Sequence, residues 1–310
     1  MQHFPVSLQG NRGAFVLLSH RPPVAAVIFV HGFFGDPRTT WVDFEHLVDS
    51  SPIWSEYDLY FYAYRSRNQI VPLAEEFGQF LTSIARAKEQ AVVGAGFFAT
   101  ASKSLSLFST PLSFWENRGN TPYNYLISVG HSTGAVIIRE VMRQKITRLA
   151  ESKGDLDVWM RTGKEKKEED PDYPDRLILR SSLRFFAPAH RGVLAAGTLG
   201  LVRSLPIIRG ITGAYLRSNP LYQNLRHDSP TILDLKEATE ELWKQYKFAA
   251  LKASSLFGTN EEIVYVGGYS HDEEVPTVSG HDHVSVCKPR PDYLKPLEFV
   301  THVFSTGKSA

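Results

Sequence analysis

The residues from 130 to 134 read GHSTG and place Ser132 between two glycines. A mostly apolar stretch, LISV, precedes them, and an apolar run compatible with a helix follows. A serine in a sharp turn between a strand and a helix has its hydroxyl lifted above the edge of the sheet. Strand and helix approach closely in such a turn, so side chains at 130 and 134 would clash. We therefore predict Ser132 to be the nucleophile of an acyl-transfer reaction.

A nucleophilic serine needs a histidine base and a carboxylate behind it, in the chain order serine, acid, histidine. Where the nucleophile lies in such a strand-to-helix turn, the base lies on a loop after the last strands of the sheet. This position points to residues 279–289, SGHDHVSVCKP. His283 is the preferred base, because turn residues precede it and an apolar, helix-like run follows. His281 lies further back on the same loop.

The acid is expected just after the strand that precedes the base loop. Residues 261–268, EEIVYVGG, are predicted to be that strand, because they form a short apolar run with β-branched residues. Asp272 follows this segment and is the preferred acid. Asp282 adjoins His283, and neighbouring side chains on a loop rarely face each other in the required geometry. The alternatives left open are Glu273, Glu274, Asp228 and Asp282.

Two backbone N–H donors are needed to stabilise the oxyanion of a tetrahedral intermediate. One is expected from Thr133, the residue after the nucleophile. The other is expected from the loop that follows the strand at 24–30, where HGFFGD supplies Phe33 as donor and Gly32 as the residue that lets the loop turn inward. Phe34, His131 and His190 are assigned to substrate binding.

The elements that would position these residues alternate between strands and helices. Helical spacing of apolar residues is seen at 73–84 and 137–149. Such alternation over most of a chain predicts an α/β fold with a mostly parallel central sheet flanked by helices. We expect one domain over residues 1–310. The predicted strands are 14–19, 24–30, 57–64, 123–130, 181–188 and 261–268.

Three stretches depart from the alternation. Residues 91–115 and 192–222 are apolar and are expected to form a cap or a lid, either a surface-seeking lid over an acyl pocket or cap helices packed on the edge of the sheet. Arginines on 192–222 fit an anionic surface or simply the wet face of a helix. Residues 151–176 are densely charged and are expected to form a solvated insertion.

In their order and spacing these motifs resemble the α/β-hydrolase superfamily, and within it the serine esterase/lipase-like group of SERAC-type and DUF676-type proteins. Four blocks carry the resemblance: 30–41, 130–142, 185–192 and 282–289. It implies a Ser-His-acid hydrolase that acts on carboxylic esters, often of lipids, without a metal or organic cofactor. In the third block FFAPAHRG replaces the group's usual TPHRG, so His190 is treated as a residue that lines or supports the pocket.

Composition narrows the range of partners. A net charge of +1 gives no general attraction for nucleic acid, so nucleic acid is not an expected partner. A single cysteine, Cys287, and an N-terminus without a signal-like apolar run favour a cytoplasmic location. No apolar run approaches the ~20 residues that span a bilayer, which leaves peripheral membrane contact open.

A metal site is an alternative, because potential ligands cluster near the end of the sequence: His271, Asp272, His281, His283 and Cys287. The H-x-H spacing alone does not support this alternative. Cys287 lies in an apolar pattern and is expected to be a small buried residue rather than a nucleophile. The predicted function is therefore a serine hydrolase acting through a covalent acyl-enzyme. Acyl transfer or thioester cleavage would use the same machinery, and the alternative from another class is a catalytically silent, hydrolase-like binding module.

Overall fold

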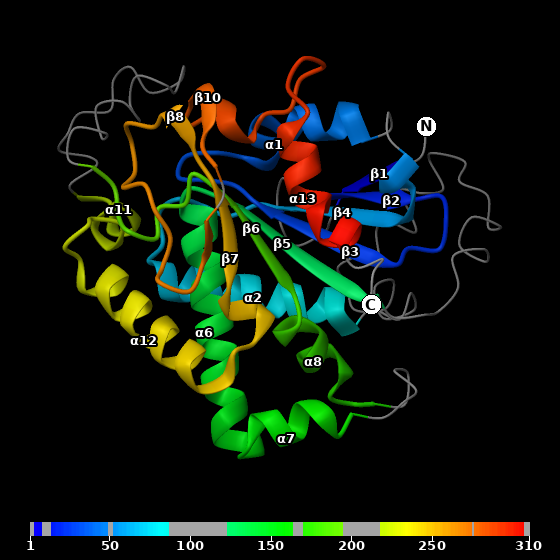
Figure 1. The fold of residues 1–310 in the computed structure, drawn as a ribbon, viewed down its shortest axis with the longest axis vertical. Helices are drawn as coiled ribbons and strands as arrows, with labels where there is room; N and C mark the ends of the chain where they lie inside the picture. Colours follow the sequence, from blue (N-terminus) through cyan, green and yellow to red (C-terminus); the bar gives the residue numbers. More distant parts are fainter. Residues whose placement is uncertain are drawn as a thin grey trace.

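An eight-stranded sheet forms the centre of the computed structural model, which describes residues 3–7, 14–48, 52–86, 123–163, 170–194, 218–274 and 276–306 (Figure 1). Its strand order is β1-β2-β4-β3-β5-β6-β7-β9. The bounds are β1 His3–Ser7, β2 Phe15–Ser19, β3 Ala25–Val30, β4 Tyr57–Tyr62, β5 Tyr125–His131, β6 Ser182–Phe186, β7 Ala253–Leu256 and β9 Glu273–Glu274. A separate pair joins β8, Gly258–Asn260, to β10, Val278–Asp282.

The six strands from β4 to β9 run parallel, whereas β1 and β2 pair antiparallel at one edge. Parallel strands need crossover connections, and helices lie in those that join β3, β4, β5, β6 and β7. All residues of β3 are buried, which is the pattern of a strand covered on both faces. The mostly parallel sheet flanked by helices is as predicted.

The helices and 3-10 turns lie between the strands in the chain. Their bounds are α1 Pro37–Leu47, η2 Pro52–Glu56, α2 Ile70–Arg86, α6 Thr133–Lys153, α7 Leu156–Arg161, α8 Tyr173–Leu179, α11 Pro220–Asn224, α12 Pro230–Tyr246, η4 Ala249–Leu251, η5 Ser285–Cys287 and α13 Lys295–Thr306. Among the described residues, none of these helices is long and apolar enough to cross a membrane.

Successive side chains of the central strands point to opposite faces of the sheet and pack into an apolar layer on each face. On one face, Phe29 of β3 packs against Trp41 and Phe44 of α1, and Phe186 of β6 meets Phe299 of α13. On the other face, the β4 tyrosines contact α2, and α2, α6, α8 and α12 pack side by side (Figure 1). Helices thus cover both faces of the sheet. A functional site can therefore form only from the loops at the ends of the strands.

The strand predicted at 261–268 is wrong. The strand lies earlier, as β7 with the sequence ASSL, and continues after Phe257 into β8. Residues 261–268 form a connection whose Ile263 and Val264 are buried in the core, which explains their apolar character without a strand. The apolar run signalled burial, and burial alone does not distinguish a strand from a packed loop.

The predicted cap segments mostly lie outside the described residues: 91–115 entirely, and 192–222 except for its two ends. The charged segment 151–176 contains the end of α6, α7 and the start of α8. Leu156 and Trp159 of α7 are buried in a small apolar cluster with Ile146 and Leu149 of α6. This segment is therefore partly a packed helical structure, although its charged residues led us to expect a solvated insertion.

Candidate active site

Ser132 lies in a strained turn between β5 and α6, with φ of 53° and ψ of −118°. A positive φ is uncommon for a residue with a side chain, and such conformations cluster at functional sites. The surrounding structure holds the turn in place. The N–H of Ser132 donates to the carbonyl of Phe186 at 3.0 Å, and its own carbonyl accepts from Ala189 at 3.1 Å and from Ala135 at 3.2 Å.

The glycines around Ser132 are required by close backbone approach. A Cβ on Gly134 would overlap the carbonyl oxygen of Val30, and one on Gly130 would lie 2.6 Å from the amide nitrogen of Ala135. Gly32, in the loop after β3, is equally confined, since a Cβ there would lie 2.9 Å from the Cβ of Ser132. The loop after β3 therefore lies directly against the serine turn, as the sequence predicts.

His283 follows β10 and pairs with a carboxylate that sequence reasoning missed. Its Nδ1 lies 3.0 and 3.1 Å from the two carboxylate oxygens of Glu261, and the two side chains are 5% and 1% exposed. Glu261 Oε1 also accepts from the N–H groups of Ile263 at 2.8 Å and Val264 at 3.0 Å. A carboxylate fixed in this way keeps the proton of a neutral His283 on Nδ1 and leaves Nε2 free to accept a proton.

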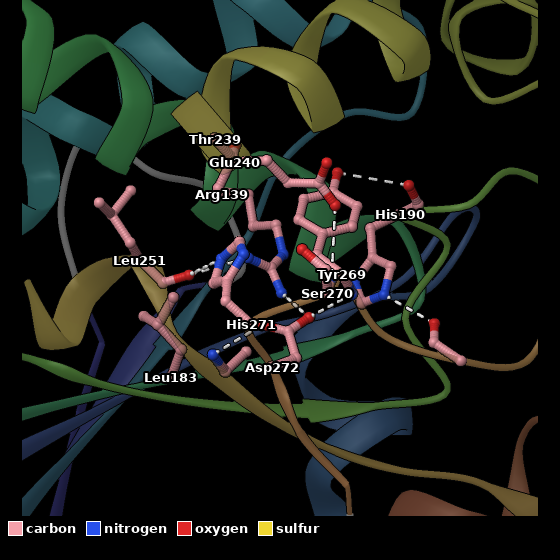
Figure 2. A network of polar contacts seen from close by, with 12 residues as sticks. Arg139, Leu183, His190, Thr239, Glu240, Leu251, Tyr269, Ser270, His271 and Asp272 are labelled. Atoms are coloured by element: carbon pink, nitrogen blue, oxygen red, sulfur yellow. Dashed lines mark hydrogen bonds and ion pairs between the residues drawn. The ribbon is translucent and has the colours of Figure 1, made fainter. Parts of the chain in front are cut away.

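Asp272, the acid predicted from the sequence, lies elsewhere, and this prediction is corrected. Its carboxylate pairs with Arg139 of α6 and accepts from the N–H groups of Ala253 at 2.9 Å and Tyr269 at 2.8 Å (Figure 2). Burial opposes its ionisation, but the Arg139 guanidinium and the hydrogen bonds outweigh burial and hold the pKa of Asp272 below its usual value. Asp272 thus anchors the start of β7 to α6.

Strand direction explains this placement. The sheet pairs the residues next to Asp272 with Ser254 and Ser255 near the start of β7, while Glu261 comes after the far end of that strand. Catalytic groups of parallel sheets gather beyond the carboxyl ends of the strands, and the chain from 261 to 272 runs away from that edge.

The other carboxylates considered from the sequence also have different partners. Glu273 bonds the hydroxyl of Ser254, Asp228 forms an exposed pair with Arg226, and Asp282 accepts from the main chain of Val284 and Ser285. The side chain of Glu274 lies outside what the structure describes.

Phe33 and Thr133, the predicted oxyanion donors, flank the serine. Phe33 adjoins Gly32 in the loop against Ser132, and Thr133 is the first residue of α6. Neither N–H donates to an acceptor within the described part of the chain. The N–H of Thr133 also carries the partial positive charge of a helix start, whereas that of Phe33 is a donor of the loop after β3 that is unpaired among the described residues.

The three residues assigned to substrate binding differ in exposure. Phe34 is half-buried, has a φ of 55° and packs its ring 4.1 Å from that of Phe33. His131 is buried, and its Nε2 lies 2.7 Å from the carbonyl oxygen of His283. His190 is fully buried, with Nε2 3.0 Å from the carbonyl of Gly267 and its ring beside Tyr269 (Figure 2). Both histidines therefore support loops, and His190 has no surface exposed to a pocket.

Three buried histidines, which we call the neutral histidines, are His31, His131 and His190. Burial lowers the pKa of His31 to about 4 and the pKa values of His131 and His190 to about 3. His31 lies after β3, where its ring stacks on Tyr64 and its Nδ1 bonds the carbonyl of Gly32 at 2.8 Å. All three are uncharged near pH 7 and serve as fixed hydrogen-bonding groups around the serine turn.

No protein-family model and no curated protein sequence matches the chain. Solved structures with similarity include the mature lipase BlEst2 of Bacillus licheniformis, at 11% identity and a TM-score of 0.43, covering 96% of each chain. The monoacylglycerol lipase of Paleococcus ferrophilus matches at 12% identity and a TM-score of 0.42, covering 99% of this chain and 98% of its own. Est1E from Butyrivibrio proteoclasticus matches at 12% and 0.43, covering 98% of each.

Strand order and the serine turn of this chain decide the fold. An antiparallel edge followed by parallel strands, with a positive-φ serine between the central strand β5 and its helix, is the α/β-hydrolase arrangement. The chain has the α/β-hydrolase fold. Within this fold, the turn at Ser132 and the loop after β3 lie where the sequence predicts, while the roles of Ser132 and His283 stay predictions. Membership of the DUF676-type group stays a prediction.

Glu261 was missed because its strand carries a weak signal. β7 has only four residues, two of them serines, and it precedes the turn-like residues GTN. The rule that the acid follows a strand end would have selected Glu261 if the short run before Gly258 had been read as the strand of the α/β-hydrolase sheet.

Metal ligands and a thiol nucleophile find no support in the described ranges. No group of three or more His, Cys, Asp or Glu side chains there could hold a metal ion. Cys287 is buried in η5, and burial raises the pKa of its thiol to about 12. A thiol with that pKa is not a thiolate near pH 7, so Cys287 is a packed apolar residue of this α/β-hydrolase domain.

Proposed function

We propose that this chain is a serine hydrolase that cleaves carboxylic esters, with Ser132 as nucleophile, His283 as base and Glu261 as the carboxylate behind the base. The observation that carries the proposal is the buried His283–Glu261 pair on the loops beside a strained serine turn. The proximity of base and nucleophile is supported by His131, which immediately precedes Ser132 and whose ring lies 4.9 Å from that of His283.

In the proposed reaction, Oγ of Ser132 attacks the ester carbonyl carbon while Nε2 of His283 accepts the hydroxyl proton. The N–H groups of Phe33 and Thr133 stabilise the oxyanion of the tetrahedral intermediate. Collapse of the intermediate breaks the bond to the alcohol, which takes the proton from His283 and leaves an acyl-serine. Water, deprotonated by His283, then attacks the acyl-serine and forms a second tetrahedral intermediate. Collapse of this intermediate releases the carboxylic acid, and His283 returns its proton to Oγ of Ser132.

Glu261 holds the imidazole in the tautomer that this sequence of proton transfers needs. It also stabilises the imidazolium that forms in each half-reaction. Its two main-chain contacts restrict the carboxylate to one orientation, so no reorganisation is needed when the charge appears on His283.

The substrate class we propose is a carboxylic ester of a small molecule or a lipid. The structures similar to this chain include a lipase and a monoacylglycerol lipase, and a hydrolase-like site with two free N–H donors suits any acyl carbonyl. Thioesters, and alcohols in place of water as acyl acceptor, would use the same groups.

A panel of p-nitrophenyl esters from acetate to palmitate tests the proposal. We expect hydrolysis by the wild-type chain and a rate at background for Ser132→Ala, with the preferred acyl length giving the depth of the pocket. Hydrolysis that is unchanged in Ser132→Ala would refute it. A folded wild-type chain that hydrolyses none of the esters would favour the silent binding module.

A further inference from the structure

His131 connects three parts of the candidate site. It is the last residue of β5 and precedes Ser132, so it is part of the serine turn itself. Its Nδ1 would lie 2.9 Å from a Cβ placed on Gly32, which puts the ring against the loop that carries Phe33. Its Nε2 lies 2.7 Å from the carbonyl oxygen of His283. The side chain is buried, so these contacts are not shared with solvent.

The hydrogen bond between His131 and His283 fixes the state of the imidazole. A carbonyl oxygen only accepts, so Nε2 of His131 must carry the hydrogen. Burial, and next the neighbouring His283, lower the pKa of His131 to about 3, so the ring stays neutral with its lone pair on Nδ1. A neutral ring adds no positive charge beside His283, whose own protonation the reaction requires.

We propose that His131 is a positioning residue that holds the main chain of His283 against the serine turn. This inference rests on the function proposed above and adds a residue to it. Glu261 fixes the imidazole of His283 from one side only, through Nδ1, and leaves the ring able to move with its main chain. The bond from His131 restrains that main chain at the carbonyl, next to the residue that must accept the proton.

The rest of the turn shows why a restraint is needed at this point. Ser132 is already held by main-chain bonds to Phe186 and Ala189. The base comes from a different segment, 278–288, which reaches the serine from the two-stranded β8–β10 pair rather than from the central sheet. A displacement of about 1 Å between reacting groups costs up to about a hundredfold in rate, so a short bond between the two segments has a large effect.

The test compares His131→Gln with His131→Asn. Both carry an amide N–H donor, but the glutamine is one methylene longer and reaches the His283 carbonyl, whereas asparagine does not. With p-nitrophenyl butyrate, we expect His131→Asn to lower kcat about 10- to 100-fold with KM within about twofold, and His131→Gln to recover most of the loss. His271→Asn is the matched control, because His271 bonds the carbonyl of Leu251 at 2.9 Å near the start of β7. It should leave kcat unchanged.

Amide hydrogen exchange of residues 278–288 supplies a readout that does not depend on activity. We expect faster exchange of this segment in His131→Asn than in wild type or His131→Gln. Equal exchange and equal kcat in the three proteins would overturn the positioning role. If the segment exchanges faster in His131→Asn but the folded wild-type protein hydrolyses none of the esters, the result would support the contact and count against the proposed function.

Discussion

Replacing Glu261 by glutamine separates the proposed acid from its structural role. Oε1 of Glu261 accepts from the N–H groups of Ile263 and Val264 and lies 3.1 Å from Nδ1 of His283, while Oε2 lies 3.0 Å from the same nitrogen. In Glu261→Gln the amide oxygen keeps the two main-chain bonds, so the amide nitrogen faces His283. An amide N–H in the place of Oε2 only donates and repels a hydrogen on Nδ1, which favours the tautomer with the proton of His283 on Nε2. That tautomer cannot accept the proton of Ser132.

The size of the effect follows from this reversal. A wrong tautomer at an intact Ser-His-acid site lowers kcat by about 10⁴-fold, which corresponds to about 5 kcal/mol in the activation free energy. We expect a loss of about 10³- to 10⁴-fold in kcat for p-nitrophenyl ester hydrolysis by Glu261→Gln. The midpoint of thermal unfolding should change little, because both main-chain bonds remain.

Asp272→Asn is the matched control, since Asp272 is the acid expected from the sequence and its carboxylate is also buried, with a side chain that is 3% exposed. Its outcome should be reversed: a stability loss with kcat nearly unchanged in the folded protein. A Glu261→Gln enzyme within tenfold of wild type, together with an Asp272→Asn enzyme that folds normally and has lost activity, would refute the assignment of the acid.

Three further outcomes are expected. Asp272→Asn leaves the buried guanidinium of Arg139 without its counter-charge, so chemical denaturation should show a loss of about 3–5 kcal/mol in the free energy of unfolding. Gly134→Ala forces a Cβ into the carbonyl of Val30 and should abolish folded expression, whereas Gly154→Ala, which meets nothing within 4 Å and strains only its φ of 72°, should remain folded. The neutral histidines have folded-state pKa values of about 3 to 4, below the unfolded value of 6.5, so between these limits the unfolded chain binds more protons. Stability to urea should therefore fall as the pH is lowered from about 7.5 toward 4, most steeply below about 6.5, and level off above about 7.5; a midpoint that rises on acidification would contradict the burial of these rings.

The serine turn could be predicted from the sequence because its constraints are local. Gly130 is required by the close approach of Ala135, five residues further along the chain, and the strand before the turn and the helix after it carry runs of buried apolar residues. Gly134 is confined by Val30 of β3, a distant contact that the sequence shows only as a second glycine. The loop after β3 was found because the apolar run of a fully buried strand leads into Gly32. Local geometry of this kind leaves a pattern that one sequence can display.

The carboxylate that pairs with His283 could not be found in this way, because its position depends on which segments enter the sheet. β7 is short and contains Ser254 and Ser255, while the connection that holds Ile263 and Val264 is more apolar than the strand. In the folded chain the segment with the weaker strand pattern, β7, enters the sheet. The carboxylate expected after the strand is therefore Glu261 and not Asp272. Asp272 was preferred because it follows the apolar run 261–268, but its carboxylate pairs with Arg139, more than a hundred residues away in the chain.

The positions of the two long apolar segments show a similar limit. Apolar composition outside the strand–helix alternation suggested a cap or a lid at 91–115 and 192–222, but whether such a segment covers a site depends on contacts with distant elements. The charged stretch around α7 illustrates the point, since its lysines and glutamates predicted a solvated loop while Leu156 and Trp159 pack against α6.

Mass spectrometry after treatment with a fluorophosphonate tests the central claim most directly. The reagent phosphonylates a serine only when a base activates the hydroxyl. The account predicts one adduct on the peptide that contains Ser132 in the wild-type protein, no adduct in Ser132→Ala, and strongly slowed labelling in His283→Ala. A folded wild-type protein that forms no adduct, or an adduct that persists in Ser132→Ala, would contradict it.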